Sequence, residues 1–222
     1  MGESRAFWAW FCVLVLASAL CAVMSVFMVL DAHARSGDDV VTVTADSIIY
    51  IAIDEQGHCS GWVVDSTTIG TAAHCSDGSK FTAKDSVGRV YPIAPAYVDH
   101  IHDLALFKLS GINKLTALPA PLGCGAAVHI GDDVTSIGYP HNQGKVTVFG
   151  KISAMPSPDA DGSWPNVYRV QIFGSPGSSG SAIFNMAGQV IAVIVGYGNT
   201  DPTGLGMLEA VPISDLCHPS VI

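Results

Sequence analysis

Three short segments carry the side chains needed for nucleophilic hydrolysis of an acyl bond. Their central residues are His74 in Thr-Ala-Ala-His-Cys, Asp103 in Asp-Leu-Ala-Leu, and Ser179 in Gly-Ser-Ser-Gly-Ser. A histidine can take the proton of a serine hydroxyl, and a carboxylate can hold that histidine in the required tautomer. Each segment alone has an ordinary explanation: a core histidine, a surface cap before a strand, or a flexible loop. Together, the three predict a catalytic triad.

The turn around Ser179 predicts a second catalytic element. A tight turn that glycine permits can direct backbone N–H groups at the oxyanion that develops during acyl transfer. The N–H groups of Gly177 and Ser179 are the candidates for this oxyanion hole.

The order of the three residues along the chain distinguishes between hydrolase architectures. Histidine, then aspartate, then serine is the chymotrypsin-type order, whereas subtilisin-type enzymes and α/β-hydrolases use other orders. The hydrolase pattern G-x-S-x-G also fails, because Ser181 occupies the position of its last glycine. A chymotrypsin-like arrangement is therefore favoured.

The elements that must position these residues are predicted to be short β-strands. Glycine (23) and proline (12) are frequent, which is typical of short strands joined by turns. Residues 111–130 contain three breakers, Pro119, Pro121 and Gly123, and are predicted to be a connector. Strands are predicted at residues 40–43, 48–53, 61–64, 90–93 and 104–109 before it, and at 134–137, 146–148, 167–172, 182–184 and 190–195 after it, with a hairpin turn at 186–189.

Two halves of about six strands each predict an all-β fold of two six-stranded antiparallel barrels. The first barrel would span about residues 40–115 and the second about residues 125–215. His74 and Asp103 fall in the first half and Ser179 in the second. The triad would therefore assemble in a cleft between the barrels.

The N-terminal residues 1–36 are predicted to be a membrane anchor or a signal segment ahead of the domain at 37–222. Ala6 to Leu30 contains no charged residue and, as a helix of about 37 Å, could cross a bilayer. Ala32-His33-Ala34 matches the small-x-small pattern of a signal-peptidase site, so secretion after cleavage at Ala34 is the alternative. Either interpretation places the domain outside the cytoplasm, in the periplasm or the extracellular space.

The charge of the chain argues against nucleic acid as a partner. The net charge is −9 and Lys and Arg form no cluster, whereas phosphate-binding surfaces need a basic stripe. The sequence has no internal repeat or heptad pattern, and it predicts no oligomeric state. The predicted partners are a polypeptide substrate and, through the N-terminal hydrophobic helix, a membrane.

Four of the six cysteines, at positions 59, 75, 124 and 217, lie beyond the N-terminal run. An even number in an exported domain favours disulfides, and four cysteines allow three connectivities. Zinc sites use closely spaced pairs such as C-x2-C, and the sequence has none. His100-x-His102-Asp103 could chelate a metal, but the context Asp-Leu-Ala-Leu favours the triad role for Asp103. No metal and no cofactor are predicted.

Several of these segments resemble the trypsin-like serine peptidases. The stretch that begins Cys59-Ser-Gly-Trp-Val-Val and ends Thr-Ala-Ala-His-Cys75 resembles the family's histidine region. Asp103-Leu-Ala-Leu resembles its aspartate strand, and residues 177–181 resemble its nucleophile loop.

Further segments resemble the bacterial high-temperature-requirement branch of that family. They are Ile137-Gly-Tyr-Pro, Gly150-Lys-Ile-Ser-Ala and residues 204–213. The resemblance covers roughly residues 45–216, and no peptide-binding module is expected to follow.

The resemblance implies a serine endopeptidase with a disulfide beside the histidine, Cys59–Cys75, and a second pair, Cys124–Cys217. It also implies that Gly196-Tyr197-Gly198 pairs with the substrate backbone as an added strand. Phe173 or Gly174 would lie near the base of the primary specificity pocket, and Gly206 on its wall. Because no acid lies there to hold Lys or Arg, a small or apolar residue is predicted before the scissile bond.

One departure from the family concerns the oxyanion turn. Ser178 stands where zymogen-type members keep an aspartate that pairs with a newly cut N-terminus, and an Ile-Val-Gly-Gly start is absent. The turn must therefore be set in another way. The alternative hypothesis is a catalytically silent protein with a protease fold that acts as a binding protein at the membrane.

Overall fold

The computed structural model describes residues 37–218 except for residues 56, 112–113, 159–161, 163 and 198–206. Contacts divide the chain into two units, Met1–Ala34 and Arg35–Ile222, and the described residues all belong to the second. The predicted N-terminal hydrophobic helix and the signal-peptidase motif lie outside the described residues. Within the described part, every helix is too short or too polar to span a lipid bilayer.

The first barrel closes six antiparallel strands in the order β1-β2-β3-β6-β5-β4. Strand β1 pairs with β2 on one side and with β4 on the other, and this second pairing closes the barrel. The strands are β1 (Ile48–Ile53), β2 (Gly57–Asp65), β3 (Thr68–Thr71), β4 (Phe81–Lys84), β5 (Val90–Asp99) and β6 (Leu104–Leu109).

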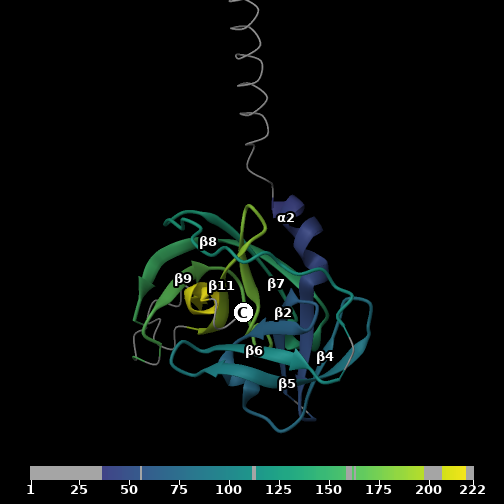
Figure 1. The fold of residues 1–222 in the computed structure, drawn as a ribbon. Helices are drawn as coiled ribbons and strands as arrows, with labels where there is room; N and C mark the ends of the chain where they lie inside the picture. Colours follow the sequence, from purple (N-terminus) through teal and green to yellow (C-terminus); the bar gives the residue numbers. More distant parts are fainter. Residues whose placement is uncertain are drawn as a thin grey trace, which may run out of the picture. The chain divides into compact units, whose positions relative to one another are not determined.

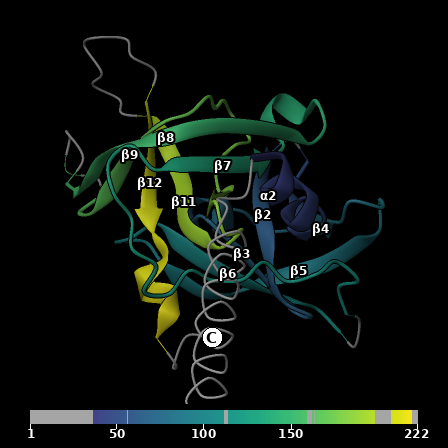
Figure 2. The same ribbon diagram turned by 90° about the horizontal axis from the view of Figure 1, so that it is seen from above.

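The second barrel closes six further antiparallel strands in the order β10-β11-β12-β9-β8-β7. Figure 1 and the view from above in Figure 2 show β7, β8, β9 and β11 gathered in this barrel, with β4, β5 and β6 in the other. The strands are β7 (Asp133–Gly138), β8 (Val146–Ser157), β9 (Val167–Gln171), β10 (Ala182–Asn185), β11 (Val190–Tyr197) and β12 (Leu208–Pro212). The predicted fold of two six-stranded barrels is confirmed.

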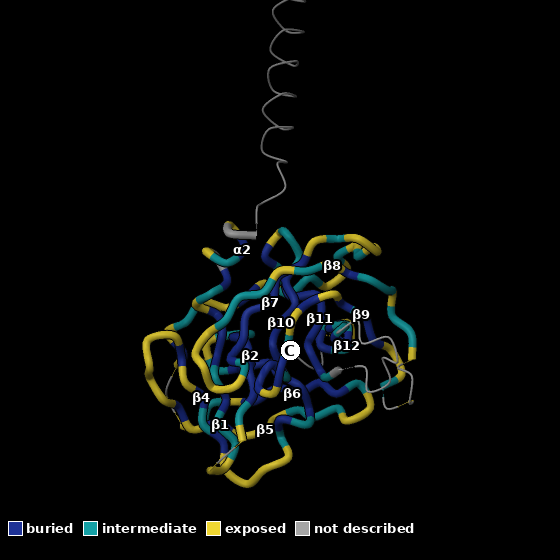
Figure 3. The backbone as a smooth tube through the Cα atoms, turned by 180° about the vertical axis from the view of Figure 1, so that it is seen from behind, coloured by how far each residue is buried: buried dark blue, intermediate teal, exposed yellow. Residues whose placement is uncertain are grey.

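The two barrels share one cluster of buried side chains. It includes Trp62 and Phe107 from the first barrel and Phe184 from the second, all fully buried. A separate cluster around Ile183 and Leu208 fills the second barrel. Burying one such side chain contributes about 1.5–3 kcal/mol. In Figure 3 the buried segments follow the strands and the exposed ones follow the connecting loops. The shared cluster fixes how residues from the two barrels face each other.

The prediction of a strand at residues 40–43 is wrong. These residues belong to the helix α2 (Gly37–Thr44), which contacts β7. Val40 and Thr44 are buried while Asp39 is exposed, and Thr44 Oγ1 donates a hydrogen bond of 2.7 Å to the carbonyl of Val40. A buried side with four-residue spacing is that of a helix. Packing of this side outweighs the β propensity of valine and threonine.

The sequence analysis also missed the strands β3, β4 and β12, whereas its other strands are observed with shifted or extended ends. Each missed strand has at most five residues, too few to show a clear alternation. The hairpin turn at 186–189 is confirmed by the bond from the N–H of Asn185 to the carbonyl of Gln189. Four 3-10 helices complete the described elements: η1 (Ala45–Ser47), η2 (Ala73–Ser76), η3 (Pro140–Asn142) and η4 (Ile213–Cys217).

Candidate active site

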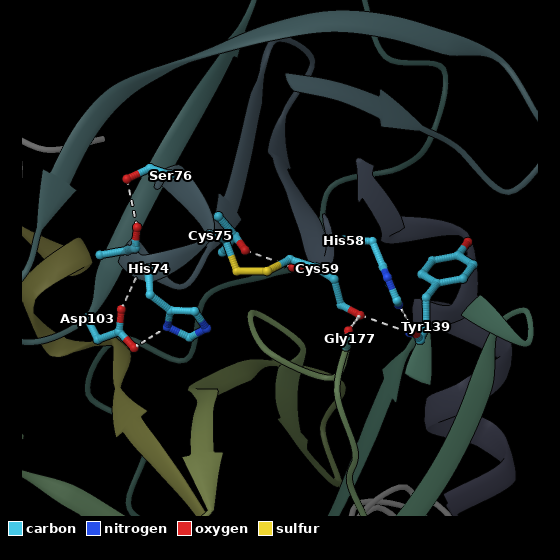
Figure 4. Close-up of a disulfide and its surroundings, with 11 residues drawn as sticks. His58, Cys59, His74, Cys75, Ser76, Asp103, Tyr139 and Gly177 are labelled. Carbon is cyan, nitrogen blue, oxygen red and sulfur yellow. Dashed lines mark hydrogen bonds and ion pairs between the residues drawn. A yellow bond between two sulfur atoms is a disulfide. The ribbon is translucent and has the colours of Figure 1, made fainter. Parts of the chain in front are cut away.

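Strand pairing in the first barrel brings His74 and Asp103 together. Strands β3 and β6 are antiparallel, and Thr71 pairs with Ala105. His74 follows the end of β3 in η2, and Asp103 immediately precedes β6, so both residues lie at the same edge of the pair. His74 Nδ1 is 2.7 Å from Asp103 Oδ2, and Figure 4 shows the imidazole turned towards this carboxylate.

The carboxylate of Asp103 is buried and both of its oxygens are used. Its side chain is 5% exposed, against 39% for His74. Oδ1 accepts a hydrogen bond of 2.8 Å from the backbone N–H of His74, and Oδ2 accepts from Nδ1. With its proton on Nδ1, a neutral imidazole presents a lone pair at Nε2. The pair can therefore act as an oriented general base.

A disulfide joins the histidine element to the neighbouring strand. Cys59 of β2 is bonded to Cys75 of η2, the residue after His74 (Figure 4). The second disulfide joins Cys124 of the connector to Cys217 of η4. Both expected pairings are present. The first one fixes η2 against β2, which also contacts the serine turn.

The turn at residues 177–181 needs glycine at two positions. Gly177 has φ +93° and Gly180 has φ +80°, backbone conformations that are costly for other residues. The N–H groups of Ser178, Gly180 and Ser181 donate to the carbonyls of Ser175, Ile194 and Ser178. The N–H groups of Gly177 and Ser179 donate to no acceptor within the described part of the chain. These two groups are the ones predicted from sequence to bind an oxyanion.

Ser179 is held against β2, the strand that the disulfide joins to the histidine element. Its carbonyl accepts a hydrogen bond of 2.8 Å from the N–H of Ser60, the residue after the disulfide-bonded Cys59. The Ser179 side chain is half-buried. Ser179 Oγ and His74 Nε2 form no hydrogen bond with each other; such bonds are often long until substrate binds. The structure brings His74 and Asp103 into direct contact and docks the serine turn on the adjoining strand.

The residues predicted to bind substrate differ in their exposure and in how closely they are packed. The Phe173 side chain is 70% exposed. A Cβ at Gly174 would come within 2.4 Å of Leu208, and a Cβ at Gly196 would come within 2.9 Å of the Trp164 ring, so both glycines permit close packing. Tyr197 ends β11, while its side chain lies outside the described atoms, as do residues Gly198 and Gly206.

Three residues near the candidate site were missed by the sequence analysis. Trp164 packs on Gly196, and Ser60 contacts the serine turn. Glu209 is 3% exposed and is paired with Gly196 across β11 and β12. Only Glu209 left a signal, because a carboxylate within the apolar run at 208–211 is unusual for a buried strand.

A second group of titratable residues joins the two barrels close to Asp103. His102 Nδ1 lies 2.8 Å from Asp99 Oδ2 and 3.3 Å from Asp215 Oδ2 of η4. The hydrogen bond to Asp99 raises the pKa of His102; burial opposes this shift, and the charges of Asp215 and Asp99 reinforce it. Burial, the largest single effect, would raise the pKa of Asp99, but the hydrogen bonds and charge of His102, together with the N–H of Ile101, outweigh it and lower the pKa.

The same three side chains are candidates for holding a metal. They offer one ligand atom each within 4.8 Å of one another, but the ion pairs between them already account for the arrangement. The chelating set considered from sequence, with His100, His102 and Asp103, is divided, because Asp103 is bonded to His74 instead.

Comparison with known proteins identifies similar sequences. The profile of the trypsin-like peptidase domain family matches residues 59–193. The chain is 28% identical over 151 residues to the periplasmic serine endoprotease DegP of Escherichia coli, covering 68% of this chain and 29% of that protein. It is 31% identical over 121 residues to the serine protease PepD of Mycobacterium tuberculosis, covering 51% of this chain and 26% of that protein. The chain thus spans less than a third of the length of these relatives.

Solved structures share the fold. A serine endoprotease from Yersinia pestis superposes with a TM-score of 0.68 at 24% identity, covering 81% of this chain and 63% of the other. An inactive form of Rv3671c from Mycobacterium tuberculosis also gives a TM-score of 0.68, at 20% identity, covering 81% and 87%.

Proposed function

The chain belongs to the trypsin-like peptidase family, and on this basis we propose that it is a serine-type endopeptidase with Ser179 as nucleophile, His74 as general base and Asp103 as the residue that orients it. One observation carries the proposal. A buried carboxylate uses both oxygens to hold the His74 element, and the facing serine turn leaves free only the two N–H groups that an oxyanion would need.

The proposed reaction begins when substrate brings a peptide carbonyl against Ser179. The hydroxyl oxygen attacks the carbonyl carbon, its proton passes to His74 Nε2, and the carbonyl oxygen becomes an oxyanion. Nε2 then gives the proton to the leaving amine as the C–N bond breaks, which leaves an acyl-enzyme. A water molecule loses its proton to Nε2 in turn, attacks the acyl carbon and releases the carboxylic acid product and the serine.

The two free N–H groups would bind the oxyanion. A donor that is already oriented costs no reorganisation when charge develops, and removal of one such donor typically lowers the rate by about 10²–10³-fold. Gly177 and Ser179 are proposed to supply these donors.

Covalent labelling tests the nucleophile. A fluorophosphonate probe should attach to Ser179, which peptide mapping by mass spectrometry identifies, and Ser179→Ala should lose both labelling and hydrolysis of casein. Folded wild-type protein that neither takes the probe nor cleaves casein would contradict the proposal and favour the silent binding protein instead. No observation in the structure favours that alternative.

The proposed substrate is a polypeptide with a small or apolar residue before the scissile bond. Support comes from Gly174, which packs on the apolar side chain of Leu208. Among the described residues, Glu209 is a buried acid that follows Leu208 on β12 and is paired with Gly196, and its placement provides a direct test. Cleavage profiling with a peptide library should show no preference for Lys or Arg. A basic preference that Glu209→Gln abolishes would overturn this part of the proposal.

The domain is proposed to work outside the cytoplasm, in the periplasm or extracellular space. Its two disulfides support this location, because such bonds persist in oxidising compartments. We propose that residues 1–36 anchor it or direct its export. N-terminal sequencing of the membrane-associated and released fractions distinguishes an anchor from a segment removed after Ala34. Reduced cysteines in protein isolated from cells would contradict the location.

A further inference from the structure

The serine turn lacks the charged group that sets this turn in zymogen-type relatives. Ser178 occupies that position, and its hydroxyl accepts a hydrogen bond of 3.2 Å from the N–H of Ser175 in the same loop. Such a local bond cannot hold the turn against the rest of the molecule. The orientation of Gly177 must therefore come from contacts with other segments.

The two peptide groups that flank Gly177 are both held through their carbonyls. The carbonyl of Pro176 accepts a hydrogen bond of 2.8 Å from the N–H of His141. The carbonyl of Gly177 accepts a hydrogen bond of 2.8 Å from Ser60 Oγ. Because a trans peptide is planar, its N–H points away from its carbonyl. The bond at Pro176 therefore directs the N–H of Gly177 to the opposite side, where no described residue accepts a hydrogen bond from it.

Among the side chains that the structure describes, Ser60 is the one with a recorded hydrogen bond donated to this turn, and all its polar atoms are engaged. Its N–H donates to the carbonyl of Ser179, and its carbonyl accepts from Thr71 Oγ1. Its hydroxyl oxygen accepts a bond of 2.8 Å from the N–H of Tyr139. With Tyr139 on one side of the oxygen, the hydroxyl proton is directed to the Gly177 carbonyl. Ser60 is fully buried, so water cannot replace this contact.

His58, two residues before Ser60 on β2, completes the contact surface. Alternate residues of a strand face the same side, so the side chain of His58 lies on the same side of β2 as that of Ser60, which bonds to Gly177. Figure 4 shows Cys59 bonded to Cys75 of the histidine element. A Cβ at Gly177 would lie 2.2 Å from His58 Nε2 and 2.6 Å from the carbonyl of Tyr139. The turn thus fits closely against β2 and cannot tilt towards it.

We propose that Ser60 is a positioning residue that holds the oxyanion turn in its working conformation, in place of a charge pair. The inference rests on the proposed function and names the device that sets its oxyanion hole. We call the hydrogen bond from the Ser60 hydroxyl to the Gly177 carbonyl the clamp. Because the clamp is made of neutral groups already present in the folded chain, the turn needs no proteolytic cut to form.

The direct test is Ser60→Ala, which leaves the Gly177 carbonyl and the Tyr139 N–H buried without partners. A lost bond of this kind should reduce kcat by roughly ten- to a hundredfold and leave KM within about twofold, because the bond acts on the transition state. Binding of a peptide boronate, which forms a tetrahedral adduct on serine, should weaken by the same factor. Binding of a product peptide should not change.

Two variants control for general damage. Ser136→Ala removes a buried hydroxyl that donates to the carbonyl of Ala182 over 2.9 Å, the same kind of bond made to the first residue of β10 and not to a peptide group that flanks Gly177. Ser47→Ala removes a buried hydroxyl of η1 that donates to the carbonyl of Thr44 over 2.6 Å, outside the proposed catalytic residues. Both should keep kcat within about twofold of wild type. If Ser136→Ala lowers kcat as much as Ser60→Ala does, or if Ser60→Ala raises KM alone, the proposal is wrong.

Hydrogen exchange separates the clamp from the chemistry. In Ser60→Ala, amide exchange of the peptide covering residues 173–181 should rise at least about tenfold above that in Ser136→Ala. Equal exchange in the two variants overturns the clamp even if the enzyme is active. If exchange is faster in Ser60→Ala while the wild-type protein hydrolyses no substrate, the role of Ser60 is supported and only the proposed function is contradicted.

Discussion

Replacing Asp103 with asparagine should invert the hydrogen bonding that orients His74. In the wild type, Oδ1 accepts from the backbone N–H of His74 and Oδ2 accepts from Nδ1. An amide has one oxygen and one NH2 group. If its oxygen keeps the backbone bond, the NH2 group faces Nδ1 and forces the ring proton onto Nε2, where the lone pair is needed. If the amide flips, two donors face each other at the backbone bond.

The size of the effect follows from these contacts. The side chain of Asp103 is 5% exposed, so water has little access to an amide at this position, and an unsatisfied buried donor costs about 1–3 kcal/mol. The charge-assisted bond that stabilises the imidazolium during catalysis is also lost, which adds about 1.5–3 kcal/mol. Together these costs correspond to a decrease in kcat of roughly 10²- to 10⁴-fold.

Steady-state hydrolysis of a fluorogenic peptide measures this decrease, with circular dichroism and the thermal midpoint as controls for folding. Asp103→Asn keeps the size of the side chain, so KM should stay within about threefold of wild type. If Asp103→Asn retains kcat within about tenfold of wild type while folded, the tautomer argument is refuted, because one of the two amide orientations would then support catalysis.

Three further predictions concern pH, the turn and the disulfides. The pKa of His102 is raised in the folded protein, so its contribution to stability is fully present below the unfolded pKa and is lost as pH rises through the folded pKa. In urea denaturation, the free energies of unfolding of wild type and His102→Gln should differ most in mildly acidic buffer and converge in alkaline buffer. A difference that stays constant with pH would refute this. Gly177→Ala should lower kcat by at least about 10²-fold, whereas Gly125→Ala, also at positive φ but with nothing within 4 Å of the added Cβ, should lower stability and leave kcat unchanged. Removal of the Cys124–Cys217 disulfide, which closes a separation of 93 residues, should lower the free energy of unfolding by about 4–5 kcal/mol. Removal of the Cys59–Cys75 disulfide should lower it by only about 3 kcal/mol. If urea denaturation shows the larger loss for Cys59–Cys75, the loop-entropy argument is wrong.

The two-barrel fold was predictable because most strands carry a local signal. Residues 48–53 and 104–109 are apolar runs whose predicted ends agree with β1 and β6. The error at residues 40–43 has a different origin, since valine and threonine favour strands unless tertiary contacts select one side of a helix. Here the contact of α2 with β7 favours the helix, and the sequence around Val40 contains no pattern that indicates this contact.

The candidate site was predictable where a residue lies in a distinctive short motif. His74 and Asp103 were chosen from such motifs, and the structure places their side chains in contact. Ser60 could not be found in this way, because its partners Tyr139 and Gly177 lie 79 and 117 residues further along the chain. A serine in a strand has no local feature that reveals such a partner. Trp164 was missed for the same reason.

The alternation of side chains along β2 has a consequence for how this protein can change in evolution. Inserting a single residue between His58 and Cys59, with His58 kept in register with β1, would turn the sulfur of Cys59 towards the serine turn and the hydroxyl of Ser60 away from it. Both halves of the proposed centre would be lost in one event, although none of its three central residues had been altered. Changes of length should therefore be confined to the ends of this strand, while substitutions remain possible within it.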